Sequence, residues 1–427
     1  MGPGGRLGTA VLAGLVLALA GQVAASPQQP AVVLADPADT TPNLRVDDLD
    51  PHPAVYALEQ SGATLYAGGQ FRGLENAART TSFARSHLAA FDAVTGAVSR
   101  GFTPRVDGSV WAVRAVGPSL YVGGTFRTVD GVARRGVAKL DAATGRLDPR
   151  FHARSVRGDV SDLKVVRGRL VVAGQFAKRL AALDLATGAD TGYLDLGITG
   201  TADGLQRPTR VYRIAVNPDQ TRLVAIGDVG QVSGQPRERA FMVDLRPGSG
   251  TLSPWYYAGL GNDCRSSKIP AYLRDVDFSP DGRYFVMVAT GGVPLAGQLG
   301  ASVCDAAARF ETGALHPQRP TWINYTGGDT LHSVAVTGAA VYVSGHQRWL
   351  DNARGHDSCA PGCAPREGIG AIDPVGGKAL PWNPGKSREV GGRDMLATRS
   401  GLWVGSDGAY FNGEYRYGIA FLPLPRR

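Results

Sequence analysis

Charged, aromatic and polar residues recur at matching positions of seven short apolar segments, and their side chains are the ones best suited to chemistry. One position holds either small or charged residues, and the position before it holds rings, a histidine and arginines. Around a shared channel the acids would supply charge and the rings a stacking surface, as in sites for sugars or cations. The candidate ligand-binding set at this channel mouth is Asp162, Arg213, Asp275, His332, Asp394, Trp111 and Tyr212.

A structural role would explain the same charges. Asp162, Asp275 and Asp394 could pair with arginines and hold neighbouring segments together. Because side chains alternate across a strand, only one of the two positions can face a channel. His332 beside an aspartate could act as a general base, but nothing in the sequence selects that role.

Familiar catalytic and cofactor-binding motifs are missing from the sequence. It contains no Gly-x-Ser-x-Gly elbow, no His-Glu-x-x-His, no Walker loop and no EF-hand loop. We therefore predict no cofactor and name no catalytic residue. Asp92, Asp141 and Asp184 each precede a Thr-Gly turn and are expected to cap it. A single turn of this kind offers too few oxygens for calcium.

The four cysteines form an even set, as expected of a protein in an oxidising compartment. Three pairings are possible. We favour the disulfides Cys264–Cys304 and Cys359–Cys363. A Pro-Gly turn lies within the second pair and can bring its two Cα atoms within disulfide reach. The alternative is a metal site that adds His346 and His356 to this pair, but the spacing is loose and we predict no metal.

Aromatic residues gather in the long connections of the later repeats. Such loops on a rigid scaffold are common sites of recognition. They could form a platform for carbohydrate or protein, or they could cap hydrophobic gaps. The residues are Trp255, Tyr256, Tyr257 and Trp349.

An internal repeat positions all of these residues. Its copies begin 50 to 62 residues apart, at Val55, Val110, Val160, Val211, Leu273, Leu331 and Gly392. In the early copies a second apolar segment ends in glycine, and a third ends in Asp before the Thr-Gly turn. Strands of this length, between Gly- and Pro-rich turns and without a helical period, predict an all-β protein.

Three or four such strands make a sheet that cannot bury both faces alone, whereas sheets stacked radially bury each other. The sequence therefore predicts a seven-bladed β-propeller, a single domain over residues 43–427, closed into a ring. The last copy ends after its third strand, at residues 419–422. We expect the N-terminal segment to complete the last blade, with residues 44–49 as the donor; the alternative is that these residues are only a linker.

The Gly-Gly-x-Phe strand ends at residues 68–71 and 123–126, followed by an apolar strand, Asp and Thr-Gly, resemble the delta-60 type of β-propeller repeat. Such repeats occur in secreted bacterial proteins. The resemblance is good over residues 55–176 and decays afterwards, where the Pro-Asp turns at 217–219 and 279–282 are more similar to generic propeller hairpins. It implies the fold but no activity, because the motif is structural.

The N-terminus has the pattern of an export signal. Arg6 precedes an apolar run of 12 residues, too short for the roughly 20 that span a bilayer, and small residues follow at 23–25. We predict a signal peptide over residues 1–25, cleaved after Ala25, and a flexible lead-in over residues 26–42 that is rich in Pro, Ala and Gln. The protein is expected to be secreted, with no membrane span.

Charge excludes one class of partner. Without Arg6, 44 basic residues face 37 acidic ones, and the basic residues are scattered rather than clustered. Nucleic-acid binding is therefore not expected. The sequence favours a non-catalytic extracellular scaffold that binds an unknown protein or carbohydrate. The alternative is an extracellular enzyme on the same ring, either a carbohydrate-active hydrolase or lyase, or a quinoprotein-like oxidoreductase.

Overall fold

The computed structural model describes residues 1, 26–201, 207–265 and 272–426. Over these ranges the chain is built of β-strands, and its one helical element is a short 3-10 turn, η1 (Ala258–Gly261). The prediction of an all-β protein is confirmed. Within the same ranges we find no helix with the length and apolar character needed to cross a bilayer. The predicted signal peptide falls outside the described residues except for Met1.

Each copy of the repeat forms one antiparallel sheet with its strands in chain order. The fourth and fifth sheets have four strands, and the first, second, third and sixth add a fourth segment through single bridges. The strands of the seven sheets are β2 (Ala54–Ser61), β3 (Thr64–Gln70) and β6 (Leu88–Asp92); β7 (Val110–Val116), β8 (Ser119–Gly124) and β11 (Val137–Asp141); β12 (Asp159–Val166), β13 (Arg169–Gln175) and β14 (Leu180–Asp184); β16 (Arg210–Val216), β17 (Arg222–Asp228), β20 (Ala240–Leu245) and β21 (Gly250–Leu252); β22 (Tyr272–Phe278), β23 (Tyr284–Thr290), β24 (Ala306–Glu311) and β25 (Trp322–Tyr325); β26 (Leu331–Val336), β27 (Val341–Gly345) and β30 (Ile369–Ile372); β31 (Gly392–Ala397), β32 (Gly401–Ser406) and β35 (Ile419–Pro423).

Short strands decorate the connections between the second and third strands of most sheets. Two further short strands, β1 and β15, precede the first and fourth sheets and pair with β4 and β18 in these connections. These strands are β1 (Asn43–Leu44), β4 (Gly73–Glu75), β5 (Ser82–Ala84), β9 (Thr128–Val129), β10 (Val132–Ala133), β15 (Ile198–Thr199), β18 (Gln231–Val232), β19 (Gln235–Pro236), β28 (Trp349–Leu350), β29 (Ala364–Pro365), β33 (Tyr410–Phe411) and β34 (Glu414–Tyr415).

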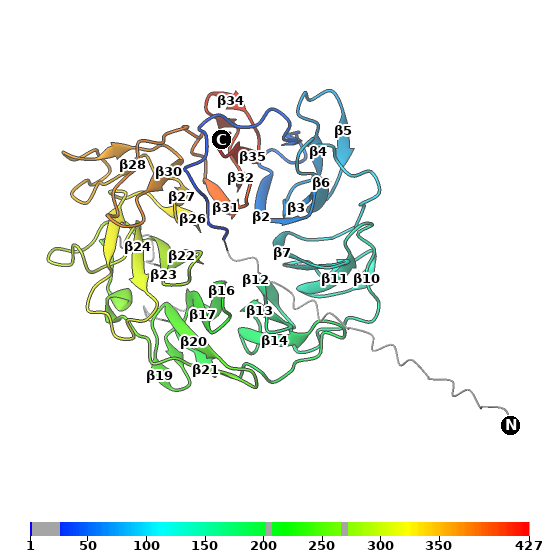
Figure 1. The fold of residues 1–427 in the computed structure, drawn as a ribbon, viewed down its shortest axis with the longest axis horizontal. Helices are drawn as coiled ribbons and strands as arrows, with labels where there is room; N and C mark the ends of the chain where they lie inside the picture. Colours follow the sequence, from blue (N-terminus) through cyan, green and yellow to red (C-terminus); the bar gives the residue numbers. More distant parts are fainter. Residues whose placement is uncertain (2–25, 202–206, 266–271, 427) are drawn as a thin grey trace.

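The seven sheets lie side by side around a common centre in chain order, and the first strand of each is innermost (Figure 1). A separate hydrophobic cluster fills the space between each two neighbours. Between the seventh sheet and the first, Trp403 and Ile419 share a cluster with Val55 and Leu58. Each sheet thus buries its apolar faces against its neighbours, including the last against the first.

The glycines at the ends of the second strands allow this close packing. A Cβ on Gly68 would lie 2.6 Å from Val110 Cγ1 of the next sheet, and one on Gly123 would lie 2.6 Å from Val160 Cγ1. Gly405 of the last sheet meets Val55 of the first in the same way, at 2.8 Å. Glycine at these positions therefore serves the close packing of neighbouring sheets.

All seven innermost strands carry a register irregularity at the same place. The pairing of first and second strands shifts between Val55 and Ala57 in the first sheet, and at the equivalent residues of the other six. A bulge leaves one residue unpaired and breaks the strict alternation of side chains. The expectation that only one of the two polar positions can face the centre therefore does not apply here.

The predicted flexible lead-in is instead packed against the sheets. Gln29 is 1% exposed, and its side-chain amide donates to the carbonyls of Thr398 and Gly401. The main-chain N–H of Val33 donates to the Tyr342 hydroxyl at 2.9 Å. Residues 26–42 show no strand pattern, so the sequence did not predict this packing. The contacts are made by one side-chain amide and by main-chain N–H groups, which leave no pattern in the composition.

The N-terminal segment lies on the free edge of the last sheet, but through other residues than predicted. The main-chain N–H of Leu34 donates to the Pro423 carbonyl and that of Ala38 to the Phe421 carbonyl, both at 2.8 Å along β35. Leu44, the first residue of the predicted donor segment 44–49, pairs with Leu74 of β4, and its main-chain N–H donates to the Tyr417 carbonyl, just before β35, at 2.9 Å. The apolar side chain of Leu44 packs in the hydrophobic cluster between the first and last sheets. An apolar residue at this position is the feature that the sequence shows.

This edge contact can be tested at Leu34, whose side chain is 43% exposed. Leu34→Pro removes the N–H that bonds to Pro423, whereas Leu34→Ala keeps it. We expect Leu34→Pro to lower the free energy of unfolding by about 1–3 kcal/mol and Leu34→Ala to change it little. Chemical denaturation of both variants measures this difference, and equal stabilities would contradict the contact.

Candidate functional site

A cavity of about 1020 Å³ lies at the centre, on the side where the innermost strands end. We call this end the hairpin side, because the turns between first and second strands surround it. The opposite end, where the innermost strands begin, is the loop side, because the long loops between second and third strands lie there. Charged residues that line the cavity include Glu59, Arg114, Lys164, Arg213, Asp277 and Asp394.

The side chain of Arg213 reaches across the centre of the molecule. Its guanidinium donates to the main-chain carbonyls of Trp111 at 3.4 Å and Ser161 at 3.2 Å, and to that of Tyr56 at 3.4 Å. These three carbonyls belong to bulged residues of the first three sheets. One side chain of the fourth sheet therefore ties three others together at the axis.

Three aspartates at the bulges each bond to the sheet that follows. Asp162 accepts the main-chain N–H of Ile214 at 2.9 Å, and Asp275 accepts that of Val334 at 2.9 Å. Asp394 accepts the N–H of Leu58 at 2.7 Å, from the last sheet to the first. These bonds support the structural alternative, in which the charges hold neighbouring sheets together, with main-chain amides as the principal partners.

Burial and opposite charge set the ionisation of this group. Burial opposes the charged guanidinium, but the carboxylates of Asp162, Asp275 and Asp394 outweigh it and raise the pKa of Arg213. Burial raises the pKa of Asp275 to about 7 and also raises that of Asp394, while Arg213 lowers both. The axis thus holds one cation beside two carboxylates, Asp275 and Asp394, that ionise reluctantly.

The predicted ligand-binding set is split between the two ends. Trp111, Asp162, Arg213, Asp275 and Asp394 line the hairpin-side cavity. Tyr212 and His332 sit at bulges but do not line this cavity.

His332 lies among cations on the loop side. It is 8% exposed, and burial together with the charges of Arg274 and Arg393 lowers its pKa well below the usual value. The neutral imidazole has no carboxylate hydrogen-bonded to it within the described ranges. A general base oriented by an aspartate, as the sequence allowed, is not supported by this geometry.

Arg274 and Lys386 are loop-side cations without a carboxylate at ion-pair distance in the part of the chain described. The Arg274 guanidinium lies 4.2 Å from the centre of the Tyr272 ring, and its Nε is buried without a hydrogen bond. Lys386 is 3% exposed, and burial lowers its pKa to about 8. Its Nζ donates to the Ser387 carbonyl at 2.6 Å. Neither residue was in the predicted ligand-binding set. Lys386 lies in the connection between β30 and β31, outside the strand positions that the sequence repeat defines.

Two other polar side chains on the loop side, those of Arg393 and Tyr212, each have an aspartate partner. Arg393 pairs with Asp407 at 3.3 Å, and its guanidinium lies 5.7 Å from the centre of the Tyr56 ring. The Tyr212 hydroxyl donates to Asp228 at 2.5 Å, and burial raises the pKa of Tyr212. The rings of Tyr212 and Tyr272 are 5.7 Å apart. The loop side thus combines cations with tyrosine rings.

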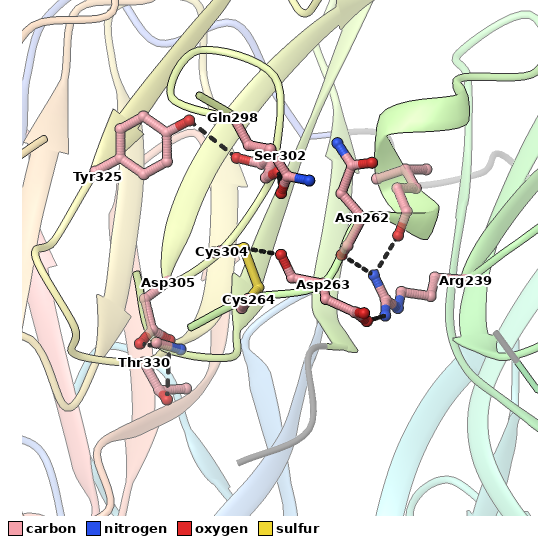
Figure 2. The surroundings of a disulfide bond; sticks show 12 residues. Arg239, Asn262, Asp263, Cys264, Gln298, Ser302, Cys304, Asp305, Tyr325 and Thr330 are labelled. Atoms are coloured by element: carbon pink, nitrogen blue, oxygen red, sulfur yellow. Dashed lines mark hydrogen bonds and ion pairs between the residues drawn. A yellow bond between two sulfur atoms is a disulfide. The ribbon is translucent and has the colours of Figure 1, made fainter. Parts of the chain in front are cut away.

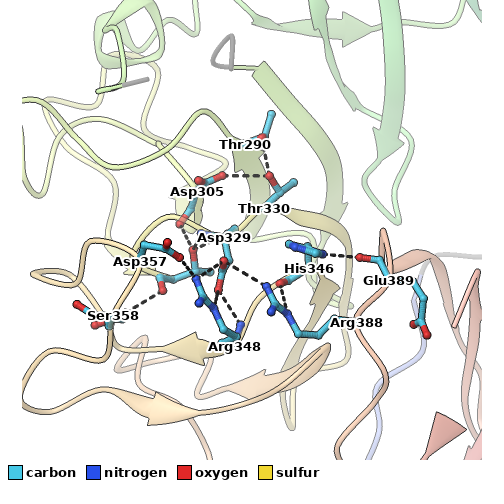
Figure 3. A network of polar contacts seen from close by, with 12 residues as sticks. Thr290, Asp305, Asp329, Thr330, His346, Arg348, Asp357, Ser358, Arg388 and Glu389 are labelled. Atoms are coloured by element: carbon cyan, nitrogen blue, oxygen red, sulfur yellow. Dashed lines mark hydrogen bonds and ion pairs between the residues drawn. The ribbon is translucent and has the colours of Figure 1, made fainter. Parts of the chain in front are cut away.

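Polar contacts fasten the loops beside these cations (Figure 3). Arg348 binds Asp329 through two bonds of 2.9 Å and also contacts Asp357. Arg388 donates to the His346 carbonyl at 2.9 Å and lies 3.5 Å from Asp329. The loops are therefore held in one arrangement on this face.

Both predicted disulfides are present. The Cα atoms are 5.8 Å apart in Cys264–Cys304 and 5.7 Å apart in Cys359–Cys363. The first joins the connection after the fourth sheet to the loop between β23 and β24, and Arg239 donates to the Asn262 carbonyl beside it (Figure 2). Among the described residues we find no cluster of three His, Cys, Asp or Glu side chains that could hold a metal.

The predicted aromatic platform does not form as a unit. Trp255 is fully buried against Phe285 and Phe310, and Tyr257 is 3% exposed. These two residues cap the core between the fourth and fifth sheets, which was the alternative. Tyr256 and Trp349 are half-buried, with an arginine over each ring, Arg237 and Arg348 respectively.

The raised pKa of Asp275 predicts a pH dependence of stability. The folded state holds this proton up to about pH 7, whereas the unfolded state releases it near pH 3.8. The stabilisation from this group is therefore complete below pH 3.8 and is lost as the pH rises to 7. Relative to the Asp275→Asn variant, the free energy of unfolding of the parent should fall by up to about 4 kcal/mol between pH 3.8 and pH 7. Chemical denaturation at several pH values measures this.

The matched control for this titration is Asp92→Asn. Hydrogen bonds from Thr95 and Val94 lower the pKa of the half-buried Asp92, so it is ionised in both states above pH 5. The difference in free energy of unfolding between Asp92→Asn and the parent should stay constant between pH 5 and 8. If the difference for Asp275→Asn were constant as well, the raised pKa assigned to Asp275 would be wrong.

Removal of the central cation should destabilise the whole molecule. Arg213→Met leaves the three carboxylates at the axis without their shared charge partner, and we expect the free energy of unfolding to fall by about 3–5 kcal/mol. Arg399→Met changes an exposed arginine near the same cavity and should alter stability by less than about 0.5 kcal/mol. Thermal and chemical unfolding compare the two variants, and similar stabilities would exclude the central role of Arg213.

Comparison with known proteins gives no family. No family model matches the sequence, and no curated protein matches it. Among solved structures, the computationally designed Ika8 protein is 13% identical, with a TM-score of 0.48 over 90% of this chain and 98% of that one. The extracellular domain of a putative one-component system from B. thetaiotaomicron is 12% identical, with a TM-score of 0.49 over 89% of this chain and 39% of that one.

Proposed function

We propose that this chain is a secreted, non-catalytic binding scaffold built as a closed seven-bladed propeller. Shared clusters between all neighbouring sheets support closure, as does the Asp394–Leu58 bond across the junction of last and first sheets. The N-terminal segment on the edge of β35 adds a further bond across that junction. Two disulfides and the resemblance to delta-60 repeats support an extracellular location.

The binding site in this proposal is the loop-side cluster of Arg274, Lys386 and Arg393. The observation that carries it is the partly buried Arg274 guanidinium, which lies over the Tyr272 ring, has an unsatisfied Nε, and has no carboxylate at ion-pair distance in the described residues. A cation removed from water without a counter-charge is costly, and an anionic ligand would supply the missing charge. The mechanism is therefore charge compensation by an incoming anion.

An acidic carbohydrate fits this surface best. A guanidinium matches a carboxylate or sulfate group in geometry, and tyrosine rings offer flat apolar faces to a sugar. Tyr272 lies beside Arg274, Tyr56 lies beside Arg393, and Tyr212 lies against Tyr272. All three rings are half-buried. Loops fastened by ion pairs and disulfides surround them, so the site needs little reorganisation to bind.

The arrangement of acids favours binding over an enzyme. Each bulge carboxylate on the hairpin side accepts a main-chain N–H from the next sheet. His332 on the loop side is neutral and faces cations. A hydrolase or lyase would need a free acid and base beside the substrate, and a quinoprotein-like oxidoreductase would need a cofactor site.

Binding can be measured by calorimetry with an oligogalacturonate and its neutral galactose counterpart. We expect the acidic oligosaccharide to bind at least tenfold more tightly at low salt and to weaken as salt rises. Arg274→Met should lower its affinity about tenfold or more while leaving stability unchanged or raised, because an uncompensated charge is removed.

Arg399→Met, on the hairpin side, is the matched control and should bind like the parent. Equal binding of acidic and neutral oligosaccharides, or equal affinity of the Arg274 and Arg399 variants, would argue against the site. Release of new reducing ends from the oligosaccharide would argue against a non-catalytic role.

A further inference from the structure

The chain enters the described structure inside the hairpin-side cavity. Ser26 and Pro27 line this cavity, and the Ser26 hydroxyl donates to Asp277 Oδ2 at 2.7 Å. From there the chain runs outward over the sixth and seventh sheets to the edge of β35 (Figure 1). The first residue after the predicted cleavage position thus lies near the axis.

Contacts just downstream fix the position of Ser26. The main-chain N–H of Gln29 donates to the Thr337 carbonyl of the sixth sheet at 2.9 Å. Its side chain donates to the carbonyls of Thr398 and Gly401 in the seventh sheet at 2.9 and 3.0 Å. With Gln29 held on both sides and 1% exposed, the two intervening residues leave Ser26 little range.

Asp277 is a half-buried carboxylate in the cavity wall, without a cation at ion-pair distance in the described ranges. It accepts the main-chain N–H of Val336 at 2.8 Å and the Ser26 hydroxyl, and burial raises its pKa to about 6. Two of the cavity's cations already have carboxylate partners: Lys164 lies 3.3 Å from Asp162, and Arg114 lies 3.0 Å from Glu59. A carboxylate in this position needs a positive charge.

We propose that Ser26 is the mature N-terminus and that its α-ammonium group is the counter-ion of Asp277. A signal peptidase of the export pathway would hydrolyse the Ala25–Ser26 peptide bond with one water. The carboxylate leaves with the leader, and the new amine takes a proton. The amine and hydroxyl of Ser26 are separated by three covalent bonds, so the hydroxyl contact with Asp277 places the amine beside the same carboxylate.

Processing would then add an ion pair to the folded protein. The α-amino group of a free chain has a pKa near 8 and carries charge at neutral pH. Before cleavage the same nitrogen is an uncharged amide, so the pair can form only after export. This inference is independent of the proposed anion site, which lies at the other end of the axis.

The experiment uses the full-length chain exported by a bacterial host. Mass spectrometry of the exported protein should give Ser26 as the first residue. A second chain carries two alanines inserted between Ala25 and Ser26, which moves the ammonium away from Asp277. We expect this insertion to reduce the folding equilibrium constant about tenfold or more in the parent, and to have little effect in an Asp277→Asn background.

Two controls make the outcome decisive. The first control inserts two alanines between Asp130 and Gly131, in an exposed turn. This insertion should change the folding equilibrium constant equally in the parent and in the Asp277→Asn variant. The Ser26 amine should also react more slowly with an amine-selective acylating reagent at pH 7 than the displaced amine does. A different first residue, an equal cost of the N-terminal insertion with and without Asp277, or equal amine reactivity would overturn the proposal.

Discussion

The thinness of each sheet is the constraint on which the rest of this structure depends. Three or four short strands have apolar side chains on both faces, and neither face can be covered from within the sheet. Every neighbouring pair therefore shares a hydrophobic cluster, and Gly68, Gly123 and Gly405 allow the sheets to approach closely. The outer faces of the last and first sheets also need a covering partner, and these two sheets pack against each other. The seven sheets therefore surround a common axis.

At that axis the seven bulges change what the innermost strands can do. At three of them a main-chain carbonyl turns toward Arg213, and at three an aspartate accepts a main-chain N–H of the next sheet. Arg213, Asp162, Asp275 and Asp394 thereby find their hydrogen-bond partners in neighbouring sheets. The same bonds hold the sheets in order.

The two ends of the axis differ in the sign of the charge left over. On the loop side Arg274 and Lys386 lack a carboxylate within the described ranges, and on the hairpin side Asp277 lacks a cation there. We infer that the first deficit is met by a ligand from outside and the second by the chain's own processed end. One physical rule, that a buried charge needs an opposite charge, leads to both proposals.

The sequence by itself determined the features that depend on a few adjacent residues. Strand lengths, the repeat, both disulfides and the turn caps are of this kind; Asp92, for example, accepts the Thr95 N–H at 2.7 Å as predicted. The grouping of Asp162, Arg213, Asp275 and Asp394 also followed from the repeat. Only the tertiary structure decided what depends on distant partners: the bulges, the burial of Trp255, the edge contact of Leu34, and the isolation of Arg274 and Lys386. Bonds to main-chain groups and the burial of a loop leave no periodic pattern in the residues that make them, because their partners lie in other sheets.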